Sequence, residues 1–182
     1  AVINGDKTTG ITTMYMDENM DTGDMILKQE VEIGENETTG ELWDKLSKIG
    51  GELLVKTLDQ IEKGIAPRIK QEGEYSLAPM LSKEMSKIDW GTQTSIQIKN
   101  LTRGLNPIMG TYAVLNEKKY KFWNVEKVDI NIFDIENVNN AKPGQILIAD
   151  EKKGLYIKTL DGVIKILEIQ GENARKMSIN DF

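Results

Sequence analysis

The stretch TTGITTMYMDENMDTGDMILKQEVEI, residues 8–33, contains two strand-like runs joined by an acidic connection. Residues 11–16 and 25–33 are rich in β-branched side chains and roughly alternate between apolar and polar positions, which predicts two β-strands. The connection MDENMDTGDM, residues 16–25, carries four carboxylates and an asparagine. It is a solvated bend, a cation-binding loop or one corner of an active site.

The spacing of the oxygen ligands argues against a calcium loop. An EF-hand loop needs oxygen ligands at positions 1, 3 and 5, glycine at position 6 and glutamate at position 12. Asp17, Asn19 and Asp21 meet the first requirement, but Thr22 stands at the sixth position and Lys28 at the twelfth. The flanking runs are also predicted to be strands, whereas an EF-hand needs helices, so calcium binding is disfavoured.

Spacing alone leaves the other two alternatives open. Asp, Asn and Gly are turn formers, so the carboxylates of a strand-to-strand connection can simply be solvated. A carboxylate on a tight turn at a strand end is also where α/β enzymes place catalytic groups, because ligands gather at the ends of the strands.

A capped helix follows the second strand. Thr38 and Glu41 have capping-box spacing, and apolar residues then recur near the helical period until Gly64. The pair Gly50-Gly51 interrupts this pattern, which predicts a kink or a close approach of backbone.

The remainder of the chain predicts a small antiparallel β-domain. An irregular segment, residues 65–86, comes first. A short helix is then predicted from about Thr94 to Leu105, because Thr94 and Gln97 have capping-box spacing. Short strand-like runs with polar connections favour a barrel or a sandwich. The runs are residues 110–116, 119–128, 144–150, 154–159 and 162–170. The polar segment 129–143 is predicted to be a connection.

The composition excludes several kinds of site. The 182 residues include no Cys and no His, so this sequence offers no disulfide, no Cys-ligated zinc and no imidazole for acid–base catalysis. The net charge of −6 divides into −8 for residues 1–64 and +2 for residues 65–182. The later part is therefore only mildly basic, and the signal for a polyanionic partner is weak by itself. No apolar run approaches the roughly 18 residues of a membrane span.

Longer matches add a resemblance to a known family. Residues 9–24 fit the pattern T-G-x-T-x-x-x-M-D-x-x-x-D-T-G-D of the methionyl-tRNA formyltransferase family. Further segments resemble the same family in the same order along essentially the whole chain. They are APMLSKEMSKIDW (residues 78–90), RGLNPIMGTYAVL (residues 103–115) and KPGQILIAD (residues 142–150).

The resemblance implies a mixed α+β chain. Residues 1–72 would be the end of a Rossmann-like formyltransferase domain, residues 73–88 an interdomain linker, and residues 89–182 an OB-like antiparallel β-barrel that binds tRNA. The amino-terminal Rossmann-like half, with the Asn and His of an Asn–His–Asp catalytic trio, would lie upstream of Ala1. The chain is therefore expected to be a fragment that is inactive alone.

The resemblance also assigns roles in the acidic connection. It makes Asp21 the catalytic Asp that orients the His while a formyl group passes from 10-formyltetrahydrofolate to the amino group of a methionyl tRNA. Asp17, Glu18, Asn19 and Met20 would lie against the pterin ring of the folate co-substrate. No metal is implied.

The resemblance implies methionyl initiator tRNA as the partner. The charges expected near its phosphates are Lys83, Lys87, Arg103, Lys118, Lys119 and Lys121. Tyr120, Phe122 and Trp123 interleave with the last of these lysines, although alternating aromatic residues in a strand are more typical of a core.

Two other functions stay open. The chain could belong to another 10-formyltetrahydrofolate-dependent transferase or hydrolase, or it could be a stand-alone RNA-binding module. For the enzyme we expect a cytoplasmic location, a monomer and no membrane association.

Overall fold

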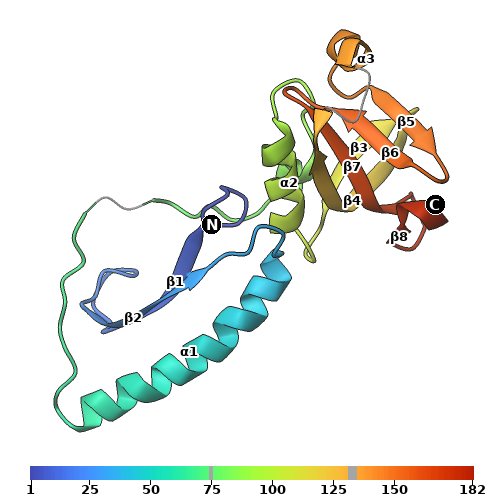
Figure 1. Ribbon diagram of the computed structural model, residues 1–182. Helices are drawn as coiled ribbons and strands as arrows, with labels where there is room; N and C mark the ends of the chain where they lie inside the picture. The colour runs from blue at the N-terminus through green and yellow to red at the C-terminus, as the bar shows by residue number, and fades with distance from the viewer. Residues whose placement is uncertain (74–75, 131–134) are drawn as a thin grey trace. The chain divides into compact units, whose positions relative to one another are not determined.

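The computed structural model describes residues 1–73, 76–130 and 135–182 of the chain (Figure 1). The chain divides into two compact units. Unit 1 comprises Ala1 and residues 6–80, and unit 2 comprises residues 2–5 and 81–182. The division after residue 80 lies within the segment 73–88 that was predicted to be a linker.

The two predicted strands at the start of unit 1 form an antiparallel hairpin. β1 (Thr8–Met14) pairs with β2 (Met25–Glu32), with Thr8 opposite Glu32 and Met14 opposite Met25. β1 therefore begins and ends earlier than its sequence pattern predicted. The reason lies in the pairing, because the Ile33 N–H donates to the Lys7 carbonyl at 2.8 Å and extends the ladder to the start of the strand.

The predicted capped helix is α1 (Thr39–Glu62), and its capping box is confirmed. The Thr38 hydroxyl accepts from the Glu41 N–H, and the Glu41 carboxylate accepts from the Thr38 N–H. α1 runs through Gly50 and Gly51 without a break, where a kink or a close approach of backbone was predicted. A Cβ on Gly50 would lie 3.0 Å from Cδ1 of Ile11, so the glycine admits a close approach of the β1 side chain.

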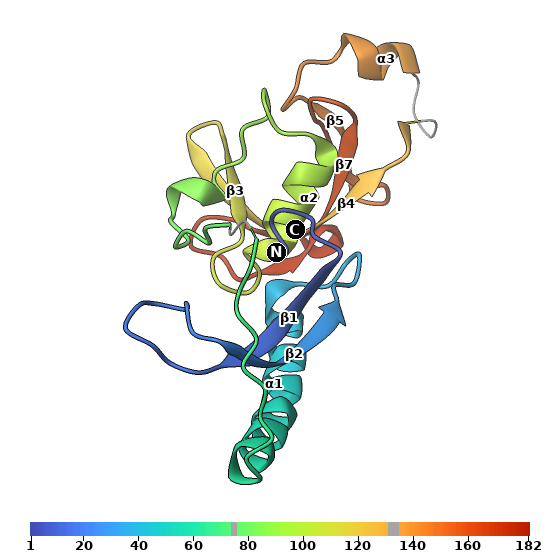
Figure 2. The ribbon, with the colours of Figure 1, turned by 90° about the vertical axis from the view of Figure 1, so that its left-hand side faces the viewer.

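One side of α1 packs against the hairpin, as Figure 2 shows. Leu42 and Leu53 are buried there, and the hydroxyls of Thr13 and Thr57 lie 2.9 Å apart across the contact. Two strands cannot cover a helix of this length completely. Exposed apolar side chains of α1 are Trp43, Leu54, Val55, Leu58 and Ile61.

Unit 2 is built on a six-stranded antiparallel sheet. Its strands are β3 (Thr111–Leu115), β4 (Lys118–Val128), β5 (Ile146–Asp150), β6 (Gly154–Lys158), β7 (Val163–Gln170) and β8 (Met177–Ser178). The strand order is β3-β4-β7-β6-β5, and β8 pairs with β7. The antiparallel β-domain is therefore as predicted. Within the part of the chain that the structure describes, β3 and β5 do not pair, so the expected OB-like barrel is not closed.

An apolar cavity of about 390 Å³ lies at the unclosed side of this sheet. Its lining comes from all five strands from β3 to β7 and from Trp90. The free edge of β3 is partly occupied, because the Ile88 N–H donates to the Tyr112 carbonyl at 2.9 Å.

The short predicted helix is α2 (Ser95–Gly104), which starts with the expected capping box between Thr94 and Gln97. It packs against β4 and β7, and Ile98 is fully buried. The described part of the unit also contains the short helices η1 (Glu84–Ser86), α3 (Ile135–Asn140) and η3 (Ile179–Asp181). α3 lies in the segment predicted to be a connection, of which residues 131–134 fall outside the described residues. Among the described helices, none combines the length and apolar character of a membrane span.

Candidate functional site

The connection of residues 15–24, called here the acidic turn, is closed by a backbone hydrogen bond. The Tyr15 N–H donates to the Asp24 carbonyl at 2.9 Å. Inside this closure, a Cβ on Gly23 would lie only 1.7 Å from the Tyr15 carbonyl oxygen. No side chain fits there, so glycine is required by the close approach of the two backbone segments. The acidic turn projects from the end of the hairpin (Figure 2).

Asp17 is engaged in the fold of the acidic turn itself. Its Oδ1 accepts from the Thr22 hydroxyl at 2.6 Å and from the Asn19 N–H at 3.0 Å. These two donors, Thr22 first, hold the pKa of the Asp17 carboxyl below its ordinary value. Asp17 therefore shapes the turn, and one of its oxygens is already used.

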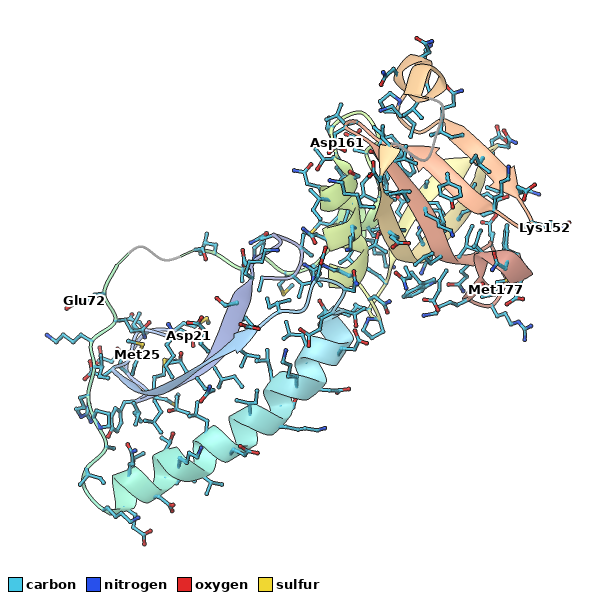
Figure 3. All side chains as sticks on the ribbon, in the orientation of Figure 1. Asp21, Met25, Glu72, Lys152, Asp161 and Met177 are labelled. Atoms are coloured by element: carbon cyan, nitrogen blue, oxygen red, sulfur yellow. The ribbon has the colours of Figure 1, made fainter. Side chains whose placement is uncertain are left out.

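Asp21 occupies a different position in the same turn. Its backbone has a φ of 57°, in the left-handed region, and its carbonyl accepts a hydrogen bond from the side chain of Gln71 at 2.8 Å. The exposed carboxylate accepts no hydrogen bond within the part of the chain that the structure describes. Figure 3 labels Asp21, which lies in the connection between β1 and β2. Its carboxylate is thus available to a group outside these residues.

The tip of the acidic turn combines exposed polar and apolar groups. Glu18 and Asn19 are exposed, and Met20 is 88% exposed. Met16, at the base of the turn, is 95% exposed. The two methionines therefore leave apolar surface exposed at the tip and the base of the acidic turn.

The acidic side chains do not gather into a metal site. Among residues 1–73, 76–130 and 135–182, no three His, Cys, Asp or Glu side chains are placed to hold a metal ion. Within the EF-hand-like spacing of Asp17, Asn19 and Asp21, the Asp17 carboxylate accepts hydrogen bonds from Asn19 and Thr22.

The basic residues predicted near tRNA all lie in unit 2, in different environments. Lys83 and Lys87 flank η1 and are exposed. Lys118 and Lys119 are exposed on β4, where Lys121 is half-buried. Arg103 differs from them, because it is only 9% exposed and its Nε donates to Oδ1 of Asn100 at 2.9 Å. The fold thus offers the lysines, rather than Arg103, to a partner.

Lys119 and Lys121 lie on one face of the sheet together with aromatic rings. The Lys119 Nζ is 3.6 Å from the ring centroid of Tyr112, and the Lys121 Nζ is 5.4 Å from that of Trp123. Lys176 also approaches the Trp123 ring, at 5.5 Å. We call Tyr112, Lys119, Lys121, Trp123 and Lys176 the lysine–aromatic face. Such pairs orient cations and leave flat apolar surface beside them.

The alternation along β4 separates the aromatic residues. Phe122 is buried in the core and Tyr120 lines the cavity, as expected for core aromatic residues, whereas Trp123 joins the lysines. A β-bulge after Phe122 contributes to this placement. Sequence reasoning missed Tyr112 and Lys176. The alternation of Lys119, Lys121 and Trp123 was readable in the sequence, but Lys176 arrives from a distant connection and has no local signal.

Comparison with known families covers both units. Residues 1–58 match the family model described as formyl transferase, and residues 80–182 match the model of the formyl transferase C-terminal domain. A methionyl-tRNA formyltransferase of Halothermothrix orenii is 45% identical, and the match covers 100% of this chain and 57% of that protein. The chain thus spans about half the length of this curated relative.

Two solved structures share the fold. HypX from Aquifex aeolicus, crystallised in complex with tetrahydrofolic acid, has a TM-score of 0.69 at 18% identity, over 99% of this chain and 30% of that one. An N-formyltransferase from Helicobacter canadensis, in complex with folinic acid and dTDP-3-aminofucose, has a TM-score of 0.66 at 20% identity, over 94% and 58%. With both family models matched in order along the sequence, the chain belongs to the formyl transferase family.

Proposed function

We propose that this chain is the carboxy-terminal part of a methionyl-tRNA formyltransferase, which transfers a formyl group from 10-formyltetrahydrofolate to the amino group of methionyl initiator tRNA. The observation that carries the proposal is the state of Asp21. The backbone around it is held, while its carboxylate has no partner among the described residues. A carboxylate presented in this way is suited to orient a catalytic group from another part of the enzyme.

In the proposed reaction that group is a histidine, which this sequence does not contain. A carboxylate within hydrogen-bond reach favours the protonated imidazole and fixes its orientation. The imidazolium and an Asn side chain would stabilise the oxyanion that forms when the methionyl amine attacks the formyl carbon. Positioning and electrostatic stabilisation carry the reaction, without a covalent enzyme intermediate.

The tip of the acidic turn would form part of the folate site. The exposed side chain of Met20 offers an apolar contact for the pterin ring, and the backbone groups of residues 17–20 offer polar contacts. Asp17 contributes through the shape of the turn, because Thr22 and Asn19 already bind its carboxylate. The tetrahydrofolic acid bound to HypX supports a folate as the co-substrate here.

The exposed apolar side of α1 supports the proposal that further sequence completes the catalytic domain. Trp43 is 65% exposed, and Leu54, Val55 and Leu58 are each more than half exposed. Covering such a surface is strongly favourable, and about 25 cal/mol is gained for each Å² of apolar area buried. In the complete enzyme we expect the remaining strands of the Rossmann-like sheet to cover it.

The test begins with the coding sequence that precedes Ala1. An S-L-L-P segment and an Asn-x-His upstream are expected, and their absence would refute the proposal. The polypeptide extended by that sequence should formylate methionyl initiator tRNA, whereas the 182-residue chain should not. Asp21→Asn in the extended polypeptide should lower kcat by about 10²-fold or more with little change in tRNA affinity.

The lysine–aromatic face, with Lys83, Lys87 and Lys118, is the proposed tRNA surface of unit 2. Each phosphate contact contributes roughly one unit to the slope of log K against log salt. Lys119→Gln with Lys121→Gln should therefore reduce this slope by about two units. The matched control is Lys152→Gln with Lys153→Gln, which removes the same charge from the turn between β5 and β6. Equal effects of the two double variants would exclude this face as the binding surface.

A second candidate is formylation of an amino sugar nucleotide. The fold similarity to the Helicobacter canadensis N-formyltransferase favours it, whereas the 45% identity to a methionyl-tRNA formyltransferase favours tRNA. Assaying the extended polypeptide with both acceptors separates the two. For the tRNA enzyme we propose action in the cytoplasm as a monomer.

A further inference from the structure

The side chain of Gln71 holds the acidic turn from outside. Its Nε2 donates to the Asp21 carbonyl at 2.8 Å and to the Gly23 carbonyl at 2.8 Å. Both partners are carbonyl oxygens, which only accept hydrogen bonds, so the NH2 group of the Gln71 amide must face them and its oxygen must point away. Gln71 thus bonds to residues on either side of Thr22.

The segment that carries Gln71 is itself attached to the base of the turn. Ile69 and Met25 exchange two backbone hydrogen bonds, at 2.7 and 3.0 Å. The Arg68 guanidinium lies 3.9 Å from the ring centroid of Tyr15, and its Nη1 is 3.4 Å from Oδ2 of Asp24. Residues 68–71 therefore contact the first residue of the turn, its last residue and the start of β2. This placement keeps the Gln71 amide beside the turn.

We infer that Gln71 is a positioning residue that sets the direction of the Asp21 carboxylate, an inference that rests on the proposed function. The Asp21 backbone has a φ of 57°, which L-residues other than Asn and Asp seldom adopt. Its carboxylate has no anchor of its own among the described residues, so the backbone alone directs it. Gln71 binds the carbonyl of that same residue. Removing this contact releases the turn to other conformations.

Two substitutions that introduce opposite charges at Gln71 test this role in the 182-residue chain. Gln71→Glu sets a carboxylate against the two carbonyl oxygens, whereas Gln71→Lys keeps an N–H donor in reach. The readout is hydrogen exchange of the Tyr15 amide, which bonds to Asp24 and reports closure of the turn. Gln71→Glu should speed this exchange about 10-fold, and Gln71→Lys should leave it near the original rate.

The matched control is Gln29→Glu on β2, which makes the same charge change in unit 1. The Gln29 amide donates to the neighbouring Glu30 carbonyl at 3.2 Å and makes no contact with the acidic turn among the residues that the structure describes. This variant should leave Tyr15 exchange unchanged. Unchanged exchange in Gln71→Glu, or equal acceleration in both glutamate variants, would overturn the positioning role.

Kinetics in the extended polypeptide separate this inference from the proposed function. Gln71→Glu should lower kcat by about 10- to 100-fold, because a catalytic group displaced by about 1 Å loses about 10²-fold in rate. The KM for tRNA should stay within about twofold of the original value. Gln71→Lys should recover most of the rate. If Asp21→Asn lowers kcat but Gln71→Glu does not, the positioning role is wrong. If the extended polypeptide formylates no tRNA, the proposed function fails, and the exchange measurement still decides whether Gln71 holds the turn.

Discussion

Substituting Gly23 by alanine tests whether the close backbone approach shapes the acidic turn. The added Cβ would lie 1.7 Å from the Tyr15 carbonyl oxygen and 2.7 Å from its carbon. Ordinary contacts of this kind begin near 3.2 to 3.5 Å, so the two segments must separate by roughly 1.5 Å. That movement breaks the 2.9 Å bond from the Tyr15 N–H to the Asp24 carbonyl and the 2.8 Å bond from Gln71 to the Gly23 carbonyl.

The magnitude follows from these two hydrogen bonds. Each contributes about 0.5–1.5 kcal/mol net, so their loss costs about 1–3 kcal/mol. Replacing glycine lowers the entropy of the unfolded chain, which offsets about 0.4–1 kcal/mol. We therefore expect Gly23→Ala to reduce the free energy of unfolding of unit 1 by about 1–2 kcal/mol. In the extended polypeptide, kcat should fall about 10²-fold, because the turn that carries Asp21 moves.

Urea denaturation followed by circular dichroism measures the stability change, and exchange of the Tyr15 amide locates it. Gly51→Ala is the matched control, because the added Cβ in the middle of α1 would meet no described heavy atom within 4 Å beyond its chain neighbours and the backbone of the helix. It should raise stability by about 0.5–1 kcal/mol through helix propensity. If Gly23→Ala is as stable as the original chain and Tyr15 exchanges at its original rate, the packing argument for this turn is refuted.

Other predictions concern the helix caps. Asp161→Ala should lower the free energy of unfolding by about 1–2 kcal/mol, because the buried N–H and hydroxyl of Ser95 both donate to the Asp161 carboxylate, at 2.7 and 2.9 Å. Asp150→Ala is the control and should change stability little, because the N–H groups that donate to Asp150 are exposed. Burial opposes ionisation of Asp161, but the donors on Ser95 and Thr159 together outweigh it and lower its pKa. The ionised Asp161 therefore stabilises the fold fully above its ordinary pKa near 4, and this stabilisation is lost as the pH falls through the lower pKa of the folded state. Asp161→Asn should remove this pH dependence of the free energy of unfolding from acid denaturation curves. Thr38→Ala should cost about 1 kcal/mol, measured by thermal melting, because α1 loses its capping box.

Local sequence patterns predicted the elements whose stabilising contacts are themselves local. Both capping boxes formed as predicted, because a cap joins residues only three apart, at Thr38 and at Thr94. The hairpin and the strands of unit 2 followed from alternation and turn residues. The boundaries of β1 shifted because pairing with β2 decides them, and α3 was missed because its helical run is short.

The sequence also determined the chemistry available at the candidate site. The chain has no His and no Cys, so imidazole and thiolate chemistry cannot come from these residues, and Asp21 was predicted to support a histidine from outside the chain. The resemblance of the full chain to formyltransferases then gave that carboxylate a specific expected role.

Only the tertiary structure decided which side chains are free and which are held. Arg103 is buried against Asn100 although its charge suggested a surface role, and Lys176 reaches the Trp123 ring from a distant connection. Gln71 bonds to Asp21 across 50 positions of sequence, a contact that no local pattern encodes. Such contacts depend on where the backbone path brings distant segments together. The sequence could therefore mark Asp21 as a candidate residue, but not Gln71 as the side chain that bonds to its carbonyl.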